Sequence, residues 1–86
     1  MSRVEIFAIV QANVRAIVEG ARTKEIRETD SMRDYGADSL EMVEVVSRSM
    51  KQLQIRVPRR ELSSAQNLGD LVSAFERAAS QTPVTV

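Results

Sequence analysis

Apolar side chains recur every three or four positions in three separate segments, which is the spacing of a helix with one buried face. Over residues 2–19 this stripe contains six residues: Ile6, Phe7, Val10, Val14, Ile17 and Val18. Ser2 and Glu5 have the spacing of a capping box at its start, and Gly20 suits a left-handed residue at its end. We therefore expect a first helix over residues 2–19. Its polar side chains are expected to face water: Arg3, Gln11, Asn13 and Arg15.

The second periodic segment covers residues 39–53. It follows Asp38, a good N-cap residue, and Glu41 completes a capping box three positions on. Met42 and Val45 are expected on the flank of this helix. Its other apolar residues are expected to face the core: Leu40, Val43, Val46, Met50 and Leu53.

The third periodic segment covers residues 67–79, with Asn67 as its expected N-cap and Asp70 three residues on. Its expected buried stripe has four members: Leu68, Leu71, Val72 and Phe75. Residues 80–86 contain a proline and have no periodicity, so we expect a flexible tail there. The rest of the chain, residues 1–79, is expected to form one domain.

Between the first two helices, residues 21–37 are polar and poorly periodic, which indicates a long loop. We expect Ile26, Met32 and Tyr35 to hold this loop against the core, with a short turn over residues 29–32. A tyrosine can pack its ring while its hydroxyl stays in water, and we expect that arrangement here.

Residues 54–58 alternate in polarity and end in Pro58, which favours an extended connection followed by a short helix over residues 59–65. Leu62 is the one strong inward contact of this helix, so it is expected to be the most mobile element. Three long helices and this short one predict an all-α four-helix bundle with a long first loop.

The composition excludes several kinds of site. The chain has no cysteine, histidine or tryptophan, so it offers no thiolate or imidazole for catalysis or for metal binding, and we expect no metal. Its formal net charge is zero, and its basic residues are divided among segments, which argues against nucleic acid as a partner. The chain has no apolar run of membrane-spanning length and no signal-peptide pattern. We expect a soluble, cytoplasmic monomer that does not bind membranes.

Residues 34–40, with the sequence DYGADSL, place one serine between a turn and a helix. Because Asp38 is expected to cap this helix, Ser39 is its first residue, and its hydroxyl can face solvent there. The unpaired backbone N–H groups and the positive end of the helix dipole favour a negative group at this position. Asp-Ser is also an ordinary way to begin a helix, so the tripeptide D-S-L alone does not define a site.

The pattern G-x-D-S-L, with a long loop before it and an amphipathic helix after it, resembles the modification site of the acyl carrier proteins of fatty acid and polyketide synthesis. In that family the serine carries 4'-phosphopantetheine, which a phosphopantetheinyl transferase takes from coenzyme A. The resemblance implies that Ser39 is the attachment point and that Asp38 caps the helix and orients the serine. It also implies a carrier without catalytic residues of its own, serving acyltransferases and ketosynthases. Because the short helix over residues 59–65 is expected to be the most mobile element, we expect a cavity for a bound acyl chain to open there.

In acyl carrier proteins, partner enzymes read the helix after the serine, commonly through acidic side chains. Glu41 and Glu44 match that pattern, and Met42 and Val45 lie beside the serine. Arg48 departs from it and has the i,i+4 spacing of an ion pair with Glu44, worth roughly a few tenths of a kcal/mol. The alternatives are a solvated face of mixed charge and, for Met42, the edge of the core.

Arg59 and Arg60 stand where the common fatty acid carriers have acidic residues, which predicts a different choice of partner. Residues 55–62 have the pattern I-x-V-P-R-x-E-L, which resembles the free-standing carriers of polyketide β-branching cassettes. Those proteins carry the acetyl or malonyl unit used by an HMG synthase-like enzyme. The resemblance therefore implies carriage in polyketide biosynthesis, with fatty acid synthesis as the alternative.

Two other classes of protein have a similar size. A helical DNA-binding or protein-interaction module would need a basic face if its ligand were DNA. An enzyme would need Ser39 to be activated by a lysine, and Lys24 and Lys51 show no sign of that role.

Overall fold

The structure, a computed structural model, describes residues 1–81. In this part of the chain the helices are α1 (Arg3–Ile17), α2 (Ser39–Leu53), α3 (Arg59–Ser64) and α4 (Leu68–Gln81), and there is no strand. Two 3-10 turns lie between α1 and α2, η1 (Glu19–Ala21) and η2 (Met32–Tyr35). The predicted all-α bundle of three long helices and one short helix, with a long first loop, is confirmed.

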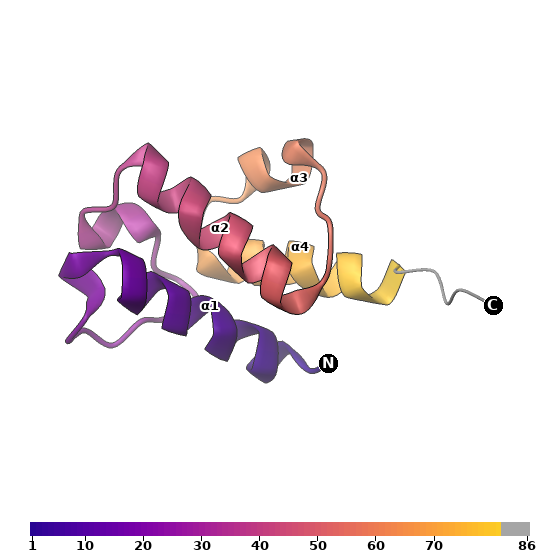
Figure 1. The fold of residues 1–86 in the computed structure, drawn as a ribbon, viewed down its shortest axis with the longest axis horizontal. Helices are drawn as coiled ribbons and strands as arrows, with labels where there is room; N and C mark the ends of the chain where they lie inside the picture. Colours follow the sequence, from indigo (N-terminus) through magenta and orange to yellow (C-terminus); the bar gives the residue numbers. More distant parts are fainter. Residues whose placement is uncertain (82–86) are drawn as a thin grey trace.

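Figure 1 shows α1 and α2 running in opposite directions, with the long first loop joining them at one end of the molecule. Helix α1 packs against both α2 and α4, whereas α3 contacts α4. The centre of the bundle holds the largest fully buried side chains: Ile6, Val10, Val14, Val18, Val45, Leu68, Val72 and Phe75. Burying each of them contributes about 1.5–3 kcal/mol, so the stripes of α1 and α4 account for most of the packing.

The orientation of α2 about its axis differs from the prediction. Leu40 and Val43 were expected in the core but are 76% and 61% exposed, whereas Val45, expected on the flank, is fully buried. Seven apolar residues cover more than half of the circumference of this helix, so their spacing fits more than one buried face. The face that is buried includes Ser49, a polar residue that the apolar pattern did not include.

Ser49 is buried because α1 supplies a polar partner for it. Asn13 donates a hydrogen bond from Nδ2 to Ser49 Oγ at 2.9 Å and another to Gln52 Oε1 at 2.9 Å. A buried hydroxyl or amide without a partner would cost free energy, and this pair satisfies both groups. The expectation that Asn13 faces water is therefore wrong, and the same pair fixes the position of α1 on α2.

Other polar residues of α1 also contact the protein where water was expected. Gln11 donates to the backbone oxygen of Ile26 at 2.9 Å. Arg3 forms ion pairs with Glu28 at 2.6 Å and with Glu76 at 2.5 Å. These contacts join the start of α1 to the first loop and to α4.

The predicted cap at the start of α1 is present, but the helix is shorter than predicted. The capping box of Ser2 and Glu5 is present, but α1 ends at Ile17. Gly20 lies within η1 and is not left-handed, so that expectation is wrong. A β-carbon on Gly20 would lie 2.2 Å from the backbone oxygen of Tyr35, so the glycine provides space between η1 and η2.

At the other end of the chain, Asn67 caps α4 as expected, because its Oδ1 accepts the backbone N–H of Asp70 at 2.8 Å. Helix α3 ends at Ser64, and α4 continues to Gln81, two residues into the segment expected to be a tail. Residues 82–86 of that expected tail lie outside the described residues.

Candidate functional site

The turn before Ser39 is built from local hydrogen bonds. Ser31 starts η2, and Asp34 accepts the backbone N–H of Ser31 at 2.8 Å. Gly36 follows η2 with a φ of 85°, the left-handed conformation that glycine adopts without steric cost. Ala37 is buried, so the chain returns to the core before α2 begins. Ser39 is thereby placed at the point where the chain changes direction.

Ser39 is the exposed first residue of α2. The predicted capping box is present. Asp38 Oδ1 accepts the backbone N–H of Glu41 at 2.8 Å, and Glu41 Oε1 accepts that of Asp38 at 3.1 Å. These bonds leave the backbone N–H groups of Ser39 and Leu40 without a partner among residues 1–81. A negative group on the Ser39 hydroxyl would meet free N–H donors and a helix dipole that contributes about 0.3–1 kcal/mol.

Tyr35 ties this turn to the rest of the first loop. Its single hydroxyl proton is shared between the carboxylate of Asp30 and the backbone oxygen of Glu25, the latter at 3.1 Å. The hydroxyl is therefore bonded to protein, contrary to the prediction that it stays in water. Burial and the Asp30 carboxylate together raise the pKa of Tyr35 to about 12. The same hydrogen bond, followed by one from the backbone N–H of Arg27, lowers the pKa of Asp30.

The first loop in turn caps α4. The backbone oxygens of Glu28 and Asp30 accept the N–H groups of Gly69 and Leu68 at 2.8 and 2.9 Å. The Arg3 guanidinium holds the Glu28 side chain and lowers the pKa of that carboxyl. The loop that presents Ser39 is therefore held by α1 and by α4 as well as by its own residues.

A groove of about 1060 Å³ lies beside α2, bordered by η2, α3 and the start of α4. Its lining begins at Met42 and Val43, one turn after Ser39, and reaches Arg59 at the start of α3. Much of the lining is apolar, including Met32, Met42, Val46, Met50, Leu62 and Leu71. This groove corresponds to the cavity expected beside the short helix, and Leu62 is the predicted inward contact of that helix.

The other predicted site residues are spread over α2 and α3. Glu44 pairs with Arg48 at 3.6 Å, and both are exposed. Met42 is half-buried, so it is both the edge of the core and part of the groove. Arg59 and Arg60 are exposed in the first turn of α3.

Two predicted assignments change with the orientation of α2. Val45 is fully buried, so it cannot touch a partner, and its assignment to the partner surface is wrong. Leu40 and Val43 are the large apolar residues exposed beside Ser39, and the sequence reasoning placed them in the core. The excess of apolar positions around α2 is the signal that could have identified them.

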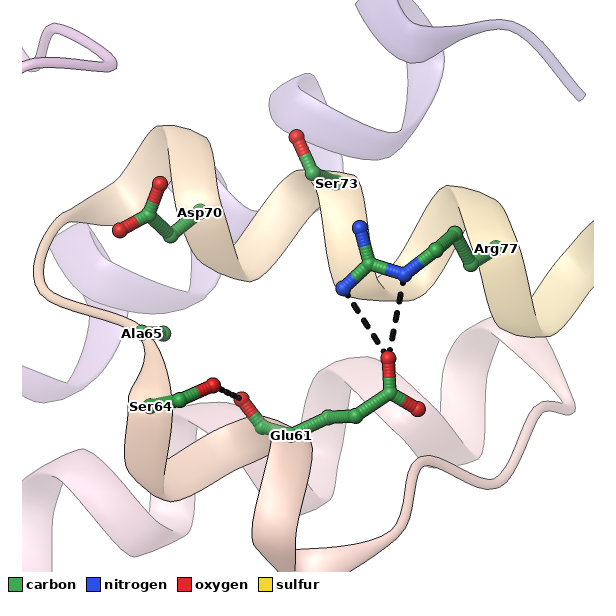
Figure 2. Close-up of a pocket in the computed structure, with 6 residues that line it drawn as sticks. All are labelled: Glu61, Ser64, Ala65, Asp70, Ser73 and Arg77. Carbon is green, nitrogen blue, oxygen red and sulfur yellow. Dashed lines mark hydrogen bonds and ion pairs between the residues drawn. The ribbon is translucent and has the colours of Figure 1, made fainter.

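A smaller cavity of about 280 Å³ lies between α3 and α4 and is lined mostly by polar side chains (Figure 2). Glu61 of α3 accepts two contacts from the Arg77 guanidinium of α4, at 3.0 and 3.1 Å. No cluster of acidic residues suited to a metal ion occurs in the described residues. We therefore assign no ligand to this cavity, whose main feature is the ion pair between Glu61 of α3 and Arg77 of α4.

The fold and the exposed serine at the start of α2 define the class of acyl carrier proteins. Residues 13–75 match the family described as the phosphopantetheine attachment site. The chain therefore belongs to the phosphopantetheine-binding carrier proteins, which carry a group for other enzymes and are not catalysts themselves.

Two relatives have a known context. The chain is 27% identical over 75 residues to the polyketide biosynthesis acyl carrier protein AcpK of Bacillus subtilis (strain 168), covering 87% of this chain and 92% of AcpK. It is also similar to the acetyl-donor carrier protein solved in complex with the HMG synthase of the curacin biosynthetic pathway. That match has 32% identity and a TM-score of 0.79, and it covers 92% of this chain and 99% of the solved one. Among residues 1–81, no helix is both long enough and apolar enough to cross a membrane.

Proposed function

We propose that this protein is an acyl carrier protein of polyketide biosynthesis whose 4'-phosphopantetheine arm is attached to Ser39. The observation that carries the proposal is the position of Ser39, exposed at the first position of a capped helix. The free N–H groups of Ser39 and Leu40 suit the phosphate of the arm. The arm supplies the thiol that the cysteine-free chain lacks, and the protein supplies the attachment site and the recognition surface.

The acyl group in this proposal is the acetyl or malonyl unit used in β-branching. The support is the similarity over nearly the whole chain to an acetyl-donor carrier protein. The corresponding partners are a cytoplasmic phosphopantetheinyl transferase, which attaches the arm, and an HMG synthase-like enzyme, which accepts the acetyl group. The apolar groove beside α2 can bind a short acyl group between these encounters.

Leu40 and Val43 are the residues that we propose first meet these enzymes. Both are exposed, and both lie within one turn of Ser39. An enzyme that receives the arm must approach this end of α2, and exposed apolar side chains there gain free energy when they are covered. Glu44 and Arg48, on the same helix, form the polar edge of this surface.

The test is acetyl transfer from the loaded protein to an HMG synthase-like enzyme. We expect transfer from the parent protein, and we expect Leu40→Ser to raise KM about tenfold, because an apolar contact of about 1.5 kcal/mol is lost. Ala16→Ser, on an exposed position of α1, is the matched control and should leave KM unchanged. Loaded protein that delivers acetyl groups only to enzymes of fatty acid synthesis would contradict the β-branching role while leaving the carrier role intact.

A further inference from the structure

The segment that comprises α2, α3 and their connection has more basic than acidic side chains. Residues 39–64 contain five basic and three acidic side chains in a chain of zero net charge. Each of the three acidic side chains has a partner. Glu41 belongs to the capping box, Glu44 pairs with Arg48, and Glu61 pairs with Arg77.

Four basic side chains of this segment have no hydrogen bond or ion pair with any described residue: Lys51, Arg56, Arg59 and Arg60. All four are exposed. They lie on the last turn of α2, the connection and the first turn of α3, which are consecutive in the chain. Figure 1 shows the connection rising from the end of α2 to the start of α3. We refer to these four residues as the basic ridge.

The basic ridge is continuous with the site already described. Arg59 lines the same groove as Val43, which lies one turn from Ser39. An enzyme that covers Leu40 and Val43 and extends along the groove therefore meets Arg59 and its neighbours next. Uncompensated charges at the rim of an interface act mainly on the rate of encounter and on the exclusion of wrong partners.

We propose that the basic ridge docks on an acidic surface of the acyl-accepting enzyme, beside the entrance that takes the arm. This inference rests on the proposed function and adds the sign of the partner's charge. Arginine suits this role because its guanidinium binds carboxylates through two parallel hydrogen bonds. An enzyme with a basic surface at that position would be repelled by Arg59 and Arg60. The ridge therefore also excludes enzymes whose basic surface fits acidic carrier proteins.

The experiment measures acetyl transfer to the HMG synthase-like enzyme at several salt concentrations. We expect the double variant Arg59→Glu and Arg60→Glu to raise KM about tenfold with kcat unchanged, and to lose the salt dependence of kcat/KM. Glutamate is favourable in the first turn of a helix, so α3 should still form. Arg59→Lys with Arg60→Lys keeps the charge and should retain most of the parent's salt dependence.

The matched control is the double variant Arg22→Glu and Lys24→Glu, which makes the same change of charge on exposed residues of the first loop. It should transfer acetyl groups with the parent's KM. An unchanged KM in the Arg59→Glu, Arg60→Glu variant would overturn the basic ridge alone, since the parent's own transfer supports the proposed function. Absence of transfer from the loaded parent would overturn both. Salt-sensitive binding to duplex DNA or anionic vesicles, with an unchanged KM for the enzyme, would assign the ridge to that polyanion and overturn the proposal.

Discussion

The first loop, residues 18–38, and the short helix α3 both border the groove, and they are held in opposite ways. The loop has little regular structure, yet Ile26 is buried, Tyr35 is bonded to Asp30, and Glu28 is paired with Arg3. Helix α3 is regular, yet none of its six described residues is buried. Because local stability depends on buried contacts, we expect the irregular loop to be held more firmly than the regular helix α3.

This difference suits the two tasks of a carrier protein. In the proposed function the loop presents Ser39 in one orientation to every enzyme, and the loop is tied to α1 and to α4. Helix α3 covers the groove and is attached by the half-buried Leu62 and the Glu61–Arg77 ion pair. A segment with so few buried contacts opens at low free energy, and in the proposed function this opening lets the acyl group enter and leave the groove.

The largest expected effect on the loop comes from Gly20→Ala. The added β-carbon would lie 2.2 Å from the backbone oxygen of Tyr35, so η1 and η2 must move apart. We expect a loss of about 2 kcal/mol in the free energy of unfolding, measured with urea. Gly36→Ala is the reference variant, because Gly36 has a φ of 85° but open space around it. If Gly20→Ala lowers the free energy of unfolding by less than Gly36→Ala does, the loop adapts easily to the added β-carbon.

Tyr35→Phe removes the hydroxyl without changing the packed ring. The loss of its hydrogen bonds to Asp30 and to the backbone of Glu25 should cost about 1 kcal/mol of unfolding free energy. Because the turn that presents Ser39 follows Tyr35 directly, we also expect a lower kcat for phosphopantetheine transfer, with an unchanged KM because the α2 surface is intact. If kcat stays at the parent's value, the hydroxyl supports the fold and does not position the serine.

The alkaline titration of Tyr35 tests the same contact without a mutation. This is the only tyrosine of the chain, which also lacks tryptophan, so phenolate absorbance reports one group. The pKa is raised from 10.0 to about 12 in the folded protein. The contribution to stability is therefore complete below pH 10 and is lost as the pH rises toward 12. A midpoint near 10 in the folded protein would mean that the hydroxyl is solvated.

Glu61→Gln should have the smallest effect on stability, about 0.5 kcal/mol or less, because the ion pair with Arg77 is partly exposed. Its effect should instead appear in amide hydrogen exchange, which we expect to become faster in α3 than in the parent. The control is Glu44→Gln, which removes the ion pair between Glu44 and Arg48 within α2. It should leave the exchange rates of α3 unchanged. If amide exchange in the parent protein is slower in α3 than around Tyr35, α3 is held more firmly than the first loop, which would contradict the comparison.

The parts that sequence reasoning predicted correctly depend on neighbours in the chain. The capping boxes at Ser2 and Asp38 and the buried stripe of α4 are set by spacing alone. The parts that it missed depend on a distant partner. Ser49 is buried because Asn13 lies opposite, and Gly20 is needed because the Tyr35 backbone passes close by.

The most direct test of the central claim is intact-protein mass spectrometry after incubation with coenzyme A and a promiscuous phosphopantetheinyl transferase. We expect the parent protein and Ser47→Ala, a control at an exposed serine of α2, to gain one phosphopantetheine each. The folded Ser39→Ala variant should gain none. A folded parent that gains no mass, or a Ser39→Ala variant that still gains it, would contradict the assignment of Ser39 as the attachment site.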